Sequence, residues 1–230
     1  MWLVAEQEIR DPVWARETVR RRTVLTRDAI VQAAVALADA EGIEAVSIRR
    51  VATELGARAM SIYTYIDRKE DLLELMADEV AADVLVPGEL PADWREATLT
   101  IARRERAAVR RHPWLIDLVA RRSTAGHVGP NMLRHLEQSL AALTTLDATR
   151  EWRLRLMTAV ADYTTGFAVR EARAAEPGLA EPYVQELLAG GEFPQLAALL
   201  AGGPPSAGDD NFEQGLRFIL DGLESRLRPQ

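Results

Sequence analysis

Ser47 to Tyr65 reads SIRRVATELGARAMSIYTY, and this stretch decides the fold. Ser47 can cap a short helix that ends at Gly56, and a second short helix then covers about 58–65. Two helices that cross steeply over so short a turn need a small residue at the crossing. In the turn they also need a residue that tolerates positive φ. Ala52 and Gly56 meet these two needs, so the stretch predicts a helix-turn-helix.

The second of these helices is the expected recognition helix. Ile62 points inward and fills a small core with Val51 and Leu55, which leaves the other side free. A helix placed in this way can enter the major groove of double-stranded DNA with its N-terminal residues on base edges. The outward residues are Arg58, Ala59, Ser61, Tyr63, Thr64 and Tyr65. The alternative is an ordinary helical hairpin inside an all-α core, because Ala and Gly four residues apart are common.

The flanking sequence favours the helix-turn-helix. Thr26 can cap a preceding helix, which Gly42 ends as a left-handed residue. The apolar face of that helix comprises Ile30, Ala33, Ala34, Leu37 and Ala38. Asp67 and Glu70 form a capping box for a following helix that runs through about Val84.

A cluster of helix-breaking residues follows, comprising Pro87, Gly88 and Pro91, and it predicts a domain border. We therefore expect a basic N-terminal arm over residues 1–24 and a helix-turn-helix DNA-binding domain over residues 25–86. A helical ligand-binding and dimerisation domain is expected over residues 87–230. The expected fold class is all-α, with about ten helices and no strand.

The order of these motifs resembles the N-terminal domain of the TetR family of repressors over about residues 24–75. The motif Ser-x-Arg-x-Val-Ala-x-x-Leu-Gly is followed by Ser-Ile-Tyr-x-Tyr-Ile and by x-x-Lys-x-x-Leu-Leu. The resemblance implies that Tyr63 and Lys69 contact phosphates. It also implies that Arg49 and the recognition-helix residues contact bases or phosphates. Of the expected contact residues, only Arg49 and Arg58 carry the guanidinium fork that suits guanine.

This sequence departs from the family's prototype inside the recognition helix. Ala59-Met60 stands where the prototype has Gln-Pro, and Thr64-Tyr65 stands where it has Trp-His. We therefore expect an operator sequence that differs from the operator of the prototype.

The net charge of −7 is concentrated away from the expected DNA-binding half. Residues 1–70 hold 11 basic and 11 acidic residues, whereas residues 71–230 hold 17 basic and 24 acidic ones. The run Arg20-Arg21-Arg22 lies just before the DNA-binding helices. It is either an arm that adds salt-dependent affinity for DNA or a solvated tail.

The second part of the chain predicts longer helices between loops. Asp93 can cap a helix to Arg111, and further helices are expected over about 114–121, 130–143, 147–174 and 210–227. Asp147 is the expected cap of the helix over 147–174. Shorter helical pieces are expected over 181–201, and loops over 123–129 and 202–208. This layout resembles the tetracycline-repressor type of C-terminal domain, which implies a homodimer formed through the eighth and last helices.

The last helix supports dimerisation on its own pattern. Apolar residues recur at helical spacing, namely Phe212, Leu216, Ile219, Leu220, Leu223 and Leu227. Gly215 and Gly222 would permit another helix to approach closely. The alternative is a helix that packs only on its own subunit.

A small-molecule inducer is the expected second partner, and its pocket is expected between helices of the C-terminal domain. The candidate ligand-binding residues are Trp114, Asn131, Met132, His135, Met157, Asp162, Tyr163 and Phe167. Leu85, Ile101 and Arg170 stand where the prototype has polar drug- or metal-binding residues, which argues against magnesium-tetracycline. Ligand binding is expected to shift the helix over about 67–84 and thereby the recognition helices.

Composition argues against several other classes of protein. The chain has no cysteine and three histidines, so neither a metal site nor any other cofactor is expected. No apolar run reaches the length of about 18 residues that a membrane span needs, and no signal peptide is evident, so we expect a cytoplasmic protein. An enzyme is disfavoured because no nucleophile–base pair or phosphate loop is apparent. A helical interaction or architectural protein without sequence specificity is the remaining alternative.

Overall fold

The computed structural model describes residues 25–121, 128–173, 182–201 and 209–227. These residues form eleven α-helices and one short 3-10 helix, with no strand among them, which confirms the all-α fold class. The basic arm, the loop at 202–208 and most of the loop at 123–129 lie outside the described residues. No helix in the described part of the chain is long and apolar enough to span a lipid bilayer.

The N-terminal helices are α1 (Arg27–Glu41), the 3-10 helix η2 (Ile43–Ala45), α2 (Ile48–Glu54), α3 (Ala59–Ile62) and α4 (Lys69–Val84). As expected, Thr26 caps α1, because its hydroxyl accepts from the Ala29 amide at 3.1 Å. Gly42 ends α1 with a φ of 84°. A cluster of fully buried side chains, with Ile30 and Leu72 among them, holds α1, α2 and α4 together.

Three local expectations were wrong. Asp71, not Glu70, completes the cap of α4: its carboxylate accepts from the Arg68 amide at 3.1 Å and from the Arg68 guanidinium at 2.9 Å. The recognition helix is one turn long, because the Tyr65 amide bonds to the Ile62 carbonyl in a tighter turn. Thr149 rather than Asp147 accepts from the first turn of α8.

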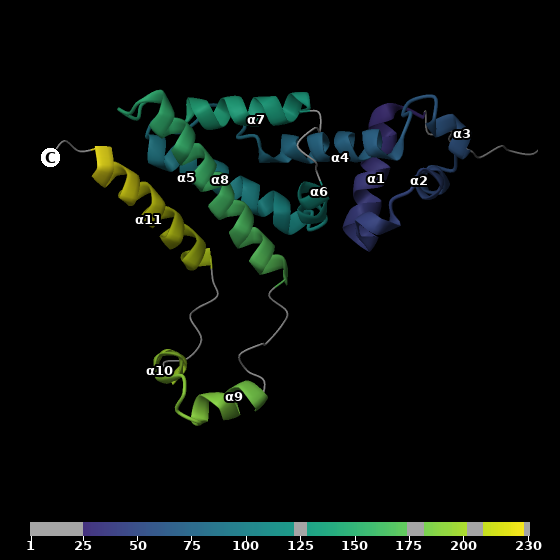
Figure 1. Cartoon of the computed structure of the whole chain (residues 1–230). Coiled ribbons are helices and arrows are strands. Elements are labelled where there is room, and N and C mark those ends of the chain that lie inside the picture. Colours follow the sequence, from purple (N-terminus) through teal and green to yellow (C-terminus); the bar gives the residue numbers. More distant parts are fainter. Residues whose placement is uncertain (1–24, 122–127, 174–181, 202–208, 228–230) are drawn as a thin grey trace, which may run out of the picture.

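The C-terminal helices are α5 (Trp94–Arg111), α6 (Leu115–Arg121), α7 (Pro130–Ala141), α8 (Arg150–Arg173), α9 (Pro182–Ala189), α10 (Pro194–Ala201) and α11 (Asp209–Leu227). Asp93 caps α5, as expected, by accepting from the Arg95 and Glu96 amides at 3.0 Å. In Figure 1, α5, α8 and α11 lie side by side, and α4 runs from the helix-turn-helix to meet α7 and α5.

The apolar stripe of α11 faces its own subunit. Phe212, Leu216 and Leu220 are fully buried in a cluster with Leu99 of α5 and Val160 of α8. This stripe therefore gives no support to dimerisation, contrary to the expectation from its spacing. Gly215 also serves the subunit's own packing, because a Cβ there would overlap the Tyr163 hydroxyl.

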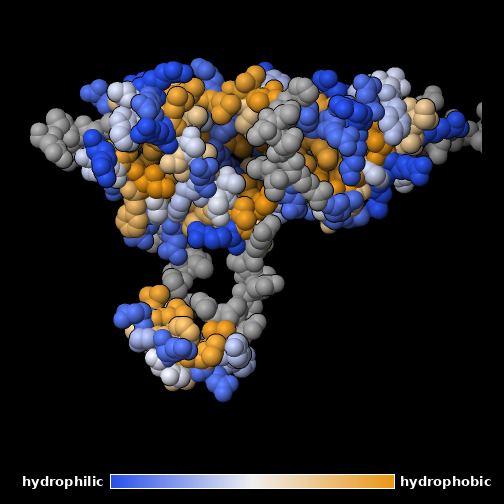
Figure 2. All heavy atoms as spheres, in the orientation of Figure 1, coloured by the Kyte–Doolittle hydropathy of each residue, from blue (hydrophilic) through white to orange (hydrophobic). Residues whose placement is uncertain are grey.

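Helices α9 and α10 pack on each other and stand apart from the other helices in Figure 1. Figure 2 shows hydrophobic residues on the surface of this unit. The exposed ones are Tyr183, Leu187, Phe193 and Leu199.

Candidate nucleic-acid interface and ligand pocket

The turn between α2 and α3 has the geometry that the sequence requires. Ser47 caps α2 by accepting from the Arg50 amide at 3.2 Å. Ala52 is 2% exposed, and its carbonyl accepts from the Ala57 amide at 2.8 Å, so the turn closes directly on this residue. Gly56 has a φ of 61°, a conformation that side chains disfavour. Ile62 is fully buried beneath α3.

The side of α3 that faces away from this core is exposed to solvent. Arg58, Ser61, Tyr63, Thr64 and Tyr65 are all exposed, with Tyr63 at 45% and Tyr65 at 44%. Ala59 is half-buried and packs against the core, so it mainly helps to hold α3 in position. Lys69 is half-buried at the first residue of α4.

The arginines near the turn differ in their freedom to bind a ligand. Arg50 bonds to Glu41 at 2.7 Å and to Glu54 at 3.1 Å, and these carboxylates raise its pKa. Arg49 and Arg58 are exposed and form no ion pair with any described residue. Among the arginines of α2 and α3, these two guanidinium groups are therefore the ones available to phosphates or guanine edges.

Sequence reasoning missed one exposed residue of α3, Met60. Its side chain is 76% exposed, which is more than any other large hydrophobic residue in the described chain. A signal was available, because the outward positions of the recognition helix flank it on both sides. The expected DNA contacts include only polar, aromatic and small residues.

Two aspartates join the DNA-binding helices to the C-terminal domain. Asp39 of α1 bonds to the His112 ring at 2.7 Å and accepts from the Trp114 indole at 2.6 Å. Asp78 of α4 accepts from the Asn131 and Met132 amides at the start of α7, both at 3.0 Å. A carboxylate is stabilised at a helix N-terminus, so α4 and α7 are held together here.

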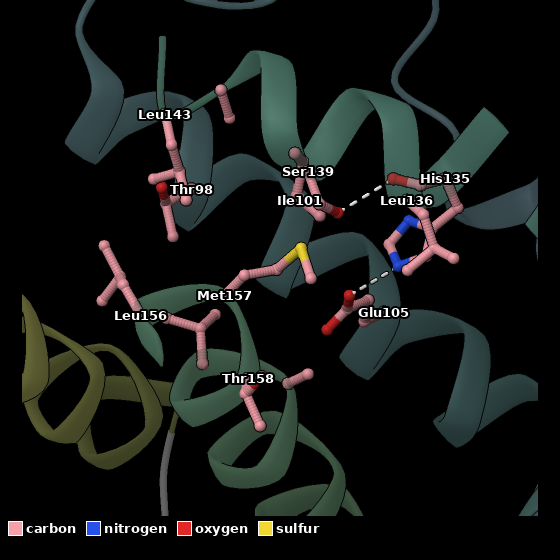
Figure 3. Close-up of a pocket in the computed structure, with 13 residues that line it drawn as sticks. Thr98, Ile101, Glu105, His135, Leu136, Ser139, Leu143, Leu156, Met157 and Thr158 are labelled. Carbon is pink, nitrogen blue, oxygen red and sulfur yellow. Dashed lines mark hydrogen bonds and ion pairs between the residues drawn. The ribbon is translucent and has the colours of Figure 1, made fainter. Parts of the chain in front are cut away.

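The C-terminal domain contains a pocket of about 190 Å³ between α5, α7 and α8. Figure 3 shows side chains from all three helices converging on it. Its lining is largely apolar and includes Ile101, Leu136, Ala142, Leu143, Leu156, Met157, Val160 and Ala161. Leu136 and Thr158 are exposed, so the pocket reaches the surface.

One polar pair marks an end of this pocket. His135 Nε2 lies 2.9 Å from Glu105 Oε1, and the two side chains are 12% and 18% exposed. Three hydroxyls also line the pocket, but each donates to a carbonyl of its own helix. Thr98 donates to Trp94, Ser139 to His135 and Thr158 to Leu154. Glu105 and His135 are therefore the main polar groups left for a ligand.

The structure brings only two of the eight candidate ligand-binding residues into this pocket, His135 and Met157. Trp114, Asn131 and Met132 instead make the contacts between the domains. Tyr163 and Phe167 pack with Phe212 between α8 and α11, and Asp162 is exposed. No group of three or more metal-ligating side chains comes together within the described residues.

A helix-turn-helix with an exposed recognition face, joined to a helical domain with an apolar pocket, defines a helix-turn-helix transcriptional regulator. Residues 30–76 match the family model for bacterial regulatory proteins of the tetR family. Residues 86–227 match the model for the tetracyclin repressor-like C-terminal domain. The chain belongs to the TetR family of bacterial regulators.

Similar proteins agree with this family. The HTH-type transcriptional repressor DrrR1 of Streptomyces coeruleorubidus is 36% identical over 222 residues, covering 88% of this chain and 78% of the relative. An HTH-type transcriptional regulator of Saccharopolyspora erythraea is 32% identical, covering 92% and 90%. The Streptomyces coelicolor protein ActR, solved in complex with actinorhodin, is 27% identical with a TM-score of 0.74, covering 88% of this chain and 97% of that one.

Proposed function

We propose that this protein is a ligand-responsive repressor that binds a palindromic operator as a homodimer. A small molecule that enters the pocket between α5, α7 and α8 would release the protein from the operator. In this proposal, Tyr63 and Lys69 contact phosphates, and Arg49 and Arg58 contact phosphates or guanine edges. The remaining contacts come from Ser61, Thr64 and Tyr65, whose side chains are exposed on the same segment.

The observation that carries the proposal is that two helices that line the pocket, α5 and α7, also contact the DNA-binding helices at one of their ends. Helix α5 lines the pocket as far as Glu105, and His112 at its end bonds to Asp39 of α1. Glu105 and His112 are seven positions apart, or about 10 Å along a helix. Helix α7 lines the pocket at His135, and its first amides bond to Asp78 of α4. A ligand that separates α5 from α7 therefore shifts the packed DNA-binding helices relative to the C-terminal domain.

The reciprocal nature of this coupling fixes the expected behaviour. If the ligand favours a spacing of the recognition helices that does not fit DNA, it lowers operator affinity, and DNA lowers ligand affinity by the same factor.

Sequence-specific DNA binding is tested by selecting binding sites from random DNA and footprinting the protein on them. A short near-palindrome is expected to be protected. Broad protection would indicate an architectural protein, and no enrichment of any sequence would contradict the proposal.

The lining also limits the class of ligand. An apolar body is expected, with one polar group directed to the Glu105–His135 end of the pocket. N-phenyl-1-naphthylamine, a neutral fluorescent probe with a single N–H donor, has this character. We expect its fluorescence to rise on binding to the protein.

Filling the pocket should abolish this binding. Ala161 lines the pocket on α8, and Ala161→Phe is expected to weaken probe binding at least tenfold, because the ring occupies the space that the probe needs. Operator affinity should change less than about threefold. The matched control is Ala141→Phe on the exposed side of α7, which should bind the probe as the unaltered protein does. If Ala161→Phe binds the probe no more weakly than Ala141→Phe does, the probe binds outside this pocket.

Dimerisation is supported by Gly222, one of the two glycines that the sequence indicated, rather than by the apolar stripe of α11. Gly222 lies inside the helix, and a Cβ at this position would meet nothing within 4 Å. Glycine costs a helix interior about 1 kcal/mol relative to alanine, and nothing in the subunit's own packing requires it here. Phe218, one turn away, is 66% exposed. Close approach of α11 from a second copy would account for both residues.

This face gives a direct test of the dimer. Gly222→Leu is expected to raise the dimer dissociation constant by roughly 100-fold or more, since a two-fold interface meets the extra side chain twice. Sedimentation should then show monomers at micromolar concentration. Gly222→Ala adds one methyl group and should remain dimeric. A dimeric Gly222→Leu protein would exclude this face of α11 from the interface.

A further inference from the structure

Met60 lies in the first turn of α3, where an exposed apolar side chain has no structural role. It is 76% exposed, whereas its neighbour Ala59 packs against the core and Ile62 is fully buried. Met60 belongs to none of the hydrophobic clusters that the described residues form. The packing of α3 on the core therefore does not involve Met60.

The surroundings of Met60 are those of a DNA-reading surface. Arg58 and Ser61 flank it and are exposed, and Tyr63 follows three residues later, on the same side of the turn. Arginine, serine and tyrosine can bond to phosphates and to the polar edges of bases. Methionine has no donor, and its thioether is at best a weak acceptor, so it cannot take part in that type of recognition.

Methionine is suited to the one apolar group that the major groove presents. This group is the C5-methyl of thymine, which distinguishes thymine from cytosine at the outer edge of the groove. An unbranched, polarisable side chain adapts its shape to such a methyl group. Water would be excluded from both apolar groups on contact, which favours the contact by the hydrophobic effect.

We propose that Met60 is a specificity-determining residue that packs on the C5-methyl of a thymine in each operator half-site. The proposal rests on the proposed function, because it requires α3 to lie in the major groove of an operator. It adds a contact by which the protein selects thymine at a defined position. A polar contact at the neighbouring positions would not supply this selection.

The test removes the methyl group from DNA without changing base pairing. An operator is first selected from random double-stranded DNA with the full-length protein. Each thymine is then replaced in turn by deoxyuridine, and Kd is measured by fluorescence anisotropy at fixed salt. At one position in each half-site, we expect deoxyuridine to weaken binding about fourfold, and about 15-fold when both half-sites are changed.

Variants of Met60 assign the effect to this side chain. Met60→Ala should bind the thymine operator about as weakly as the unaltered protein binds the deoxyuridine operator, and it should no longer distinguish the two. Met60→Leu keeps an apolar group of similar size and should retain at least a twofold preference for thymine. Because Met60 is exposed, both variants should unfold at the same temperature as the unaltered protein within about two degrees.

The salt dependence of binding separates this contact from phosphate contacts. Met60→Ala should leave the slope of log Kd against log salt unchanged, whereas Lys69→Ala should reduce it by about one. The proposal is overturned if no deoxyuridine substitution weakens binding, or if Met60→Ala remains as sensitive to the methyl group as the unaltered protein. Failure to select any operator sequence would instead contradict the proposed function.

Discussion

Replacing Arg106 by alanine is expected to lower the free energy of unfolding by about 3 kcal/mol. The Arg106 side chain is only 8% exposed on α5, and its Nε donates to Glu171 of α8 at 2.6 Å. A second guanidinium nitrogen bonds to the other oxygen of the same carboxylate. Its Cζ also lies 4.7 Å from the centre of the Phe212 ring of α11. Truncation would therefore break links among three helices and remove both Arg106 hydrogen bonds from the Glu171 carboxylate.

Arg103 provides a matched control for Arg106 on the same helix. It bonds to Glu213 of α11 at 2.6 Å, but the two side chains are 41% and 33% exposed. An ion pair with this exposure contributes about 1 kcal/mol or less, because water screens it. Urea denaturation of the variants Arg103→Ala and Arg106→Ala should show this difference. Equal destabilisation would mean that burial does not set the strength of these pairs.

The effect of Arg106 on stability should depend on pH in one direction. Its hydrogen bond and charge hold the pKa of Glu171 below its ordinary value of 4.5. A carboxyl whose pKa is lower in the folded state adds stability above its unfolded pKa and loses it as the pH falls through the folded value. The difference between the unaltered protein and Arg106→Ala should therefore be full at pH 7 and shrink below about pH 4.5. A difference that grows in acid would contradict this assignment.

Many features that depend on neighbouring residues could be predicted from the sequence, although the expected caps of α4 and α8 were wrong. The caps at Thr26, Ser47 and Asp93 formed as expected, because a side-chain oxygen needs only an amide two or three residues ahead. Gly42 and Gly56 both have positive φ, since a turn of fixed length demands it. The helix-turn-helix is a product of such local requirements, and for this reason most of its outward face could be predicted, except that Ala59 is half-buried and Met60 is exposed.

Features that depend on contacts between distant residues could not be predicted. The apolar spacing of α11 marks a buried face, but it does not say whether the same chain or a second copy covers it. The partner of Arg106 lies 65 residues away, and no local pattern indicates it. Tyr163 and Phe167 are aromatic residues of α8, as a ligand site would require, yet they pack with Phe212. Glu105 could not be predicted as a pocket residue, because only its contact with His135 of another helix identifies it.

A second large effect is expected for Ala52→Leu, which should weaken operator binding at least 100-fold. Ala52 is 2% exposed at the crossing of α2 and α3, and the amide of Ala57 bonds directly to its carbonyl. Three extra carbon atoms have no space there, so α3 must move away from α2. Overpacking of this kind costs about 1–3 kcal/mol of folding stability.

The loss of affinity should exceed the loss of stability because specific binding depends on where α3 lies. Proteins of this type bind their operators about 10³- to 10⁷-fold more tightly than unrelated DNA, and most of that difference requires base contacts. A recognition helix displaced from the groove keeps its phosphate attraction but loses those contacts. Ala52→Leu should therefore bind the operator with an affinity close to that for random DNA.

Two controls separate this effect from general unfolding. Ala52→Ser keeps the small size, and its hydroxyl can bond to a carbonyl of its own helix, so operator affinity should fall less than about fivefold. Binding of N-phenyl-1-naphthylamine reports on the pocket between α5, α7 and α8, which Ala52 does not touch. Ala52→Leu should bind the probe normally while failing to recognise the operator. Operator affinity within about threefold of the unaltered protein would show that α3 tolerates a larger side chain at its crossing with α2.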